Sequence, residues 1–120
     1  MTGDITAVAL DIETANLDMD AEGLAFGDPQ GWRVSCVGVH FVGTSKDRLY
    51  VHDYGAVMGT VGHTDAYDVH PLAMLPMHMD GWLMRGIPLI THNGEGFDLP
   101  ILAKPMVDGG AGCAKAVSRY

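Results

Sequence analysis

The chain has 120 residues, of which 48% are hydrophobic, and its 15 acidic against 7 basic side chains give a net charge of −8. This composition argues against disorder and favours one folded domain. Two cysteines argue against a disulfide scaffold, and the excess of acid excludes a broad basic surface for nucleic acid. With no long apolar run and no basic leader, we expect no membrane contact and a cytoplasmic location.

Three strands are predicted in the first half of the chain. Residues 6–12 (TAVALDI) form a short, partly β-branched run between polar residues, which is typical of a buried strand. Residues 34–42 alternate between apolar and other side chains, and residues 49–54 form a third strand. The polar segment 43–48 between them predicts a hairpin loop.

The middle of the chain is harder to interpret. Residues 55–76 contain scattered glycine, proline and histidine without a readable period, which predicts a long loop. Residues 77–85 (MHMDGWLMR) predict a short helix, and Gly86 stands near the position where glycine ends helices.

The last part predicts a strand at 87–91 and a helix over 97–106, with Pro100 in its first turn. Residues 107–120 are Gly/Ala-rich and weakly patterned, so we divide the chain into a domain over 1–106 and a tail. The order of the predicted elements is three strands, a helix, a strand and a helix. This order predicts an α/β fold with a mixed sheet.

Two carboxylates stand at the end of the first predicted strand. Asp11 and Glu13 are two residues apart, so their side chains project from the same face. Two close anions repel and raise each other's pKa, and a divalent cation such as Mg²⁺ or Mn²⁺ removes this conflict. The alternative interpretation is a strand that simply ends in solvent with polar residues.

A second polar segment follows the predicted strand at 87–91. His92, Asn93 and Gly94 lead through a glycine-containing turn to Asp98, which opens the last helix. The alternative interpretation is that Asp98 caps this helix and that Asn93 and Gly94 form an ordinary turn.

Together the two segments resemble the first two motifs of the DEDD, or DnaQ-like, 3′–5′ exonucleases. Asp11 and Glu13 match the Asp-x-Glu motif of that family, and Asn93, Phe97 and Asp98 match its Asn-x-x-x-Phe-Asp element. The resemblance covers residues 5–14 and 85–103 closely. It implies an RNase H-like fold, in which a mixed five-stranded sheet carries flanking helices on both faces.

The resemblance also implies a reaction, the two-metal hydrolysis of phosphodiesters at the 3′ end of single-stranded DNA or RNA. The Mg²⁺ or Mn²⁺ ligands and catalytic carboxylates would be Asp11, Glu13 and Asp98. The 3′-terminal nucleotides would be contacted by Thr14, His92, Asn93 and Phe97, with packing as the alternative role of Phe97.

One family motif is missing from this chain. The family carries His-x-x-x-x-Asp or Tyr-x-x-x-Asp on a later helix, whereas Asp108 is the only acidic residue after Asp98 and lacks either partner. Three explanations of the missing motif are possible. The chain is short at its C-terminus, it is a degenerate relative, or its site is completed by a homo-oligomer or a complementing C-terminal fragment. We therefore expect a weak or inactive hydrolase when the chain is alone.

Two other functions remain open. The first is a non-catalytic module that binds nucleic acid or protein and keeps the exonuclease fold, and the second is an acidic structural protein with chance motifs.

The remaining chemically interesting residues favour structural roles. The spacing of His63, His70 and His78 matches no common zinc site. Cys36 lies among apolar neighbours and is expected in the core, whereas Cys113 is expected at the surface of the tail. The two tryptophans are expected to be buried rather than stacked on bases.

Overall fold

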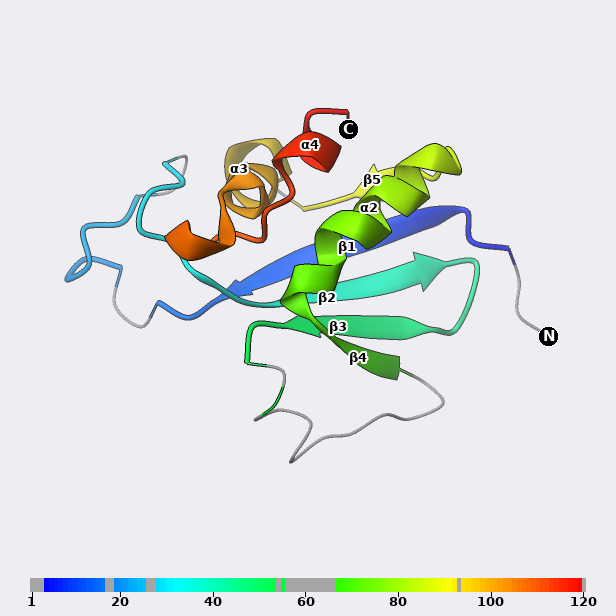
Figure 1. Ribbon diagram of the computed structural model, residues 1–120, viewed down its shortest axis with the longest axis horizontal. Helices are drawn as coiled ribbons and strands as arrows, with labels where there is room; N and C mark the ends of the chain where they lie inside the picture. The colour runs from blue at the N-terminus through cyan, green and yellow to red at the C-terminus, as the bar shows by residue number, and fades with distance from the viewer. Residues whose placement is uncertain are drawn as a thin grey trace.

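The computed structural model describes residues 4–16, 19–25, 28–53, 55, 67–92 and 94–119. A twisted sheet forms one layer, and the helices form a second layer against it (Figure 1). The predictions that concern His63 and Asn93 lie outside the described residues. None of the described helices combines the length and the apolar character that crossing a membrane requires.

The described strands form one five-stranded mixed sheet in the order β4-β3-β2-β1-β5. Its members are β1 (Ala7–Thr14), β2 (Val34–Val42), β3 (Asp47–Val51), β4 (Tyr67–Pro71) and β5 (Leu89–Ile90). β1 pairs antiparallel with β2 and parallel with β5. β3 pairs antiparallel with β2 and parallel with β4. The prediction of an α/β fold with a mixed sheet is thus confirmed.

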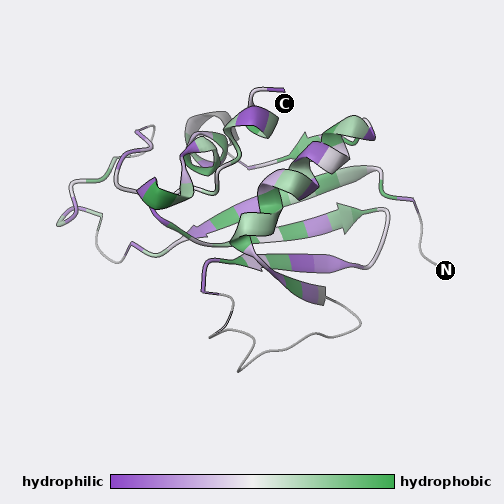
Figure 2. Ribbon diagram, in the orientation of Figure 1, coloured by the Kyte–Doolittle hydropathy of each residue, from purple (hydrophilic) through white to green (hydrophobic). Residues whose placement is uncertain are grey.

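The two faces of the sheet differ in chemistry because side chains alternate along each strand. On β1, Val8, Leu10 and Ile12 are buried in the main core cluster, whereas Asp11 and Glu13 are exposed. The same alternation on β2 puts Val37, Val39 and Phe41 in the core, and the bands of colour along the strands follow it (Figure 2). We call the face that carries Asp11 the open face.

The described helices contribute side chains to this same core cluster. The 3₁₀ turn η1 (Leu72–Met74) leads into α2 (Leu75–Met84), from which Leu75, Met79 and Trp82 are buried. Gly86 has φ of 69° directly after this helix, as its position in the sequence predicted. The remaining helical segments are η2 (Gly94–Asp98), α3 (Leu99–Ala103), η3 (Met106–Asp108) and α4 (Ala114–Val117).

Several predictions differ from the structure. The helix expected over 97–106 is limited to α3, because Lys104 is extended before Pro105. β4 lies in the stretch that was predicted to be loop. Cys113, expected at the surface, is buried with Ala111 and Ala116, so the Gly/Ala-rich tail packs on the core. Helices were expected on both faces, but the described α-helices all pack into the one core cluster.

Candidate functional site

The two carboxylates of the first motif lie at the C-terminal half of β1, on the open face. Asp11 is opposite Gly38 and Glu13 is opposite Cys36 on β2, and the pairing shifts register between Glu13 and Thr14. Such irregularities re-aim side chains at the end of a strand and recur near active sites. Burial, and then the charges of Glu13 and Asp11, raise the pKa of the Cys36 thiol. The two carboxylates and this thiol therefore share one face, so Cys36, which was expected in the core, lies half-buried on the open face instead.

β5 brings the second motif to the same edge of the sheet. It runs parallel to β1, with Ile90 opposite Ala9, so both strands leave the sheet at the same end. A hollow of about 700 Å³ lies here on the open face. Its lining includes Ala9, Asp11, Gly38, Leu49, Ile90 and His92. The hollow has an apolar floor and carries Asp11 and His92 on its wall.

Asp98 is the most unusual side chain of the site. It stands where the π-helical turn η2 passes into α3, and only 3% of its surface is exposed. Its carboxylate makes no cap hydrogen bond to the helix, and its Oδ2 atom is buried without a hydrogen-bond partner among the residues that the structure describes. The interpretation of Asp98 as an ordinary helix cap is therefore wrong. A buried carboxylate oxygen without a partner is costly and calls for an explanation.

The electrostatics connect Asp98 with the first motif. Burial raises the pKa of the Asp98 carboxyl, the charge of Asp11 raises it further, and His92 opposes both effects. The charges of Asp11 and His92 therefore both influence the ionisation of Asp98. A carboxyl group whose pKa is raised by burial together with a charged neighbour is typical of functional sites.

The substrate-contacting residues of the prediction have separate environments. Thr14 ends β1 half-buried, and His92 is exposed just beyond β5. Phe97 packs edge-on against Trp32, with ring centroids 5.0 Å apart and ring planes at 81°. Trp32 in turn donates from Nε1 to the carbonyl oxygen of Ala25 at 3.2 Å. Of the two roles considered for Phe97, this contact supports the packing role.

We expect Phe97→Leu to reduce the free energy of unfolding, because an edge-to-face aromatic pair contributes about 0.5–1.5 kcal/mol beyond its buried area. A double-mutant cycle with Trp32→Leu, measured by urea denaturation, isolates this term. A coupling energy near zero would contradict the packing role. The Mn²⁺ response described below should survive in Phe97→Leu, because the side chain supports the site rather than binding metal.

The donor set suits a hard cation, although the ligands are not fully assembled. Asp11, Glu13 and Asp98 offer only carboxylate oxygens, which Mg²⁺ and Mn²⁺ prefer. Among the described residues, no three acidic, histidine or cysteine side chains form a ready-made metal group. The buried, unpartnered Oδ2 of Asp98 nevertheless fits a missing positive partner.

Sequence reasoning did not anticipate Gly38 and Cys36 as neighbours of the carboxylates. Their place follows from the pairing of β1 with β2, which one strand alone does not specify. Gly38 did carry a signal, because a glycine inside an alternating strand often marks a close approach of another group. A Cβ at this position would lie 3.9 Å from the carbonyl oxygen of Asp11 and 4.0 Å from Cδ2 of Leu49, which is ordinary van der Waals contact.

Comparisons of the chain with protein-family models, with curated proteins and with solved structures gave no significant match.

Proposed function

We propose that this chain is a metal-dependent 3′–5′ exonuclease-like protein with an RNase H-like fold, acting on single-stranded DNA or RNA. The observation that carries the proposal is the buried Asp98 carboxylate, whose Oδ2 atom has no hydrogen-bond partner among the described residues and whose pKa is raised by burial and by the charge of Asp11. The sheet supports it, because β1 is an interior strand with one antiparallel and one parallel neighbour, and β1 and β5 end at the same end of the sheet.

Asp11, Glu13 and Asp98 would hold Mg²⁺ or Mn²⁺. When bound, such cations polarise a phosphodiester and supply an activated water for hydrolysis. The residues of this chain have complementary tasks. Asp98 and Asp11 provide negative charge in a place where a cation relieves their repulsion. His92 lies on the wall of the hollow, where its imidazole is available to a phosphate oxygen. The hollow itself has the volume of a small-ligand pocket.

A binding module without catalysis is the second candidate function. It is favoured by residues 99–120, which contain no His-x-x-x-x-Asp or Tyr-x-x-x-Asp pattern and so supply no general base of that kind. Fluorescence anisotropy with a labelled single-stranded oligonucleotide, followed by gel analysis of the same samples, separates the two candidates. Binding with an intact 3′ end supports the module, and shortened products support the exonuclease.

Titration with Mn²⁺ tests the proposed site. We expect the unfolding temperature of the wild-type chain to rise with Mn²⁺, because a ligand that binds only the native state stabilises it by about 2.7 kcal/mol at 100 times its dissociation constant. Asp11→Asn and Asp98→Asn should each lose most of this increment. The increment over the metal-free value is compared, because the substitutions also change the starting stability.

Asp108→Asn is the matched control, since it removes the same charge from an exposed position in η3. It should keep the full Mn²⁺ increment. A wild-type chain that does not respond to Mn²⁺, or a response that persists in both site variants, contradicts the proposal.

A further inference from the structure

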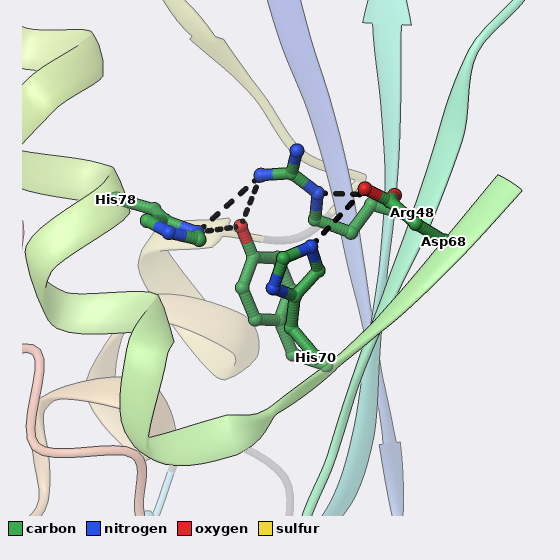
Figure 3. Close-up of polar contacts among 5 residues, drawn as sticks. Arg48, Asp68, His70 and His78 are labelled. Atoms are coloured by element: carbon green, nitrogen blue, oxygen red, sulfur yellow. Dashed lines mark hydrogen bonds and ion pairs between the residues drawn. The ribbon is translucent and has the colours of Figure 1, made fainter. Parts of the chain in front are cut away.

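A second polar cluster lies on the helix-covered face of the sheet, away from the open face. The cluster consists of Arg48 and Tyr50 of β3, Asp68 and His70 of β4, and His78 of α2 (Figure 3). Tyr50 is fully buried, and the Arg48 and Asp68 side chains retain only about a fifth of their exposure. We call these five residues the β3–β4–α2 cluster.

Arg48 organises the cluster. Its Nε atom donates to Oδ1 of Asp68 at 3.2 Å, and its Nη1 atom donates to the Tyr50 hydroxyl oxygen at 3.1 Å. The guanidinium also lies over the ring of Phe41, 5.0 Å from the centroid. His70 on β4 contacts the other carboxylate oxygen of Asp68 through Nε2, at 3.1 Å. Arg48 and Asp68 therefore connect the side chains of β3 and β4.

The geometry favours a neutral His78. Its Nδ1 atom lies 2.6 Å from the Tyr50 hydroxyl oxygen and 3.3 Å from Nη1 of Arg48. Arginine is a donor only, so a hydrogen bond between these two nitrogens requires Nδ1 to accept. Because the Tyr50 hydroxyl accepts from Arg48, its own proton is free to go to Nδ1 as well. This arrangement favours the neutral tautomer with its ring proton on Nε2.

A second proton on His78 is unfavourable in this arrangement. It would occupy Nδ1, where it would compete with the donors of Tyr50 and Arg48, and it would put a positive charge beside Arg48. Burial, Arg48 and His70 all lower the pKa of His78, and only Asp68 opposes them. Tyr50 offers no negative charge at this point, because burial raises its pKa to about 12. These four residues are the titratable and charged groups that β3 and β4 present to His78.

We propose that the β3–β4–α2 cluster is an acid-sensitive latch, which holds the segment 67–84 on β3 while His78 is neutral and loosens it when His78 is protonated. The segment is continuous, because β4 leads through η1 directly into α2. β4 is the last strand at its edge of the described sheet. When the latch loosens, β4 separates from β3 and the edge of β3 is uncovered. An edge strand that is uncovered is a template for pairing with another chain.

The direction of the pH effect follows from linkage. The pKa of this histidine is lower in the folded protein than in the unfolded chain, where it is about 6.5. Well above pH 6.5 the free energy of unfolding does not depend on this group. Below that pH the unfolded chain binds the proton more readily, so the free energy of unfolding decreases. The latch is therefore closed at neutral pH and weakens in mild acid. Asp68 does not produce this change, because Arg48 and His70 hold its pKa below the ordinary range of aspartate.

Hydrogen exchange of the intact chain at pH 7.5 and 5.5, corrected for intrinsic exchange rates, tests the latch. In the wild type, we expect the amides of β4 and α2 to lose protection several-fold in acid, while those of β1 and β2 keep theirs. In His78→Asn the amide oxygen replaces Nδ1 as an acceptor and cannot titrate, so this acid response should disappear. His70→Gln, which keeps a donor toward Asp68, should retain the response.

Three results overturn the proposal. They are unchanged protection of β4 and α2 in acid, equal loss across all strands, and an acid response that disappears in His70→Gln but not in His78→Asn. If His78→Asn does not fold, ¹⁵N chemical shifts of the wild-type imidazole decide. A proton on Nε2 of His78 at pH 7.5 supports the latch, and a proton on Nδ1 contradicts it.

Discussion

Asp98→Asn is expected to stabilise the metal-free chain at neutral pH, because burial and the charge of Asp11 both disfavour the ionised carboxylate. The substitution removes a charge from an oxygen that is buried without a partner, and it ends the repulsion with Asp11. Because the pKa of Asp98 is raised, the charged form opposes folding, and this cost is fully present at pH 7.

Urea denaturation at pH 7 with a chelator measures this effect. Asp108→Asn is again the control and should change stability by less than about 0.5 kcal/mol, as expected for a surface position. A clear loss of stability in Asp98→Asn would show that the carboxylate has a structural partner. In that case the main support for the metal site disappears.

The same substitution separates stability from function. If Asp98→Asn is more stable without metal and no longer responds to Mn²⁺, the native carboxylate is retained at a cost to folding. Such costs are expected where a site is arranged for a ligand rather than for the free protein. A capping role would give the opposite result, since loss of a cap lowers stability.

The fold could be predicted where one side of a strand is buried. The alternation of β2 and the apolar run of β1 depend only on which residues face the core, and both strands were predicted. β4 could not be predicted in this way. Its Asp68 and His70 point to the covered face, and they are tolerated there because Arg48 binds Asp68 and His70 binds Asp68. A polar residue that is satisfied by a partner far along the chain leaves no local signal.

The site shows the same division. The spacing of Asp11 and Glu13 alone placed both on one face, whereas Asp98 as a third ligand follows only from the resemblance to the exonuclease motifs and stays a prediction. The absence of a hydrogen bond to Asp98 Oδ2 could not be predicted, because it depends on how η2 turns into α3. The tail was misjudged because small residues such as Ala111 and Ala116 carry little hydrophobic pattern, although both are buried.

Trimming of 3′ ends by this chain alone is expected to be very weak or absent. The sequence after Asp98 offers neither the fourth carboxylate nor the base of the third motif. General acid–base catalysis contributes about 10²–10⁴-fold to rates, and linked catalytic groups act as a unit. The measurement is the shortening of 5′-labelled single-stranded DNA and RNA by purified chain with Mg²⁺ or Mn²⁺, with Asp11→Ala as the reference for contamination.

Free imidazole in the reaction tests the cause of the weakness. If a missing base limits the rate, imidazole should raise residual trimming by the wild-type chain but leave Asp11→Ala unchanged, because that variant has also lost a metal ligand. Robust trimming without imidazole that Asp11→Ala abolishes would show that the described residues already supply a base, and His92 beside Asp98 is then the side chain to replace. Mn²⁺ stabilisation and oligonucleotide binding without trimming, even with imidazole, favour the binding module over the exonuclease.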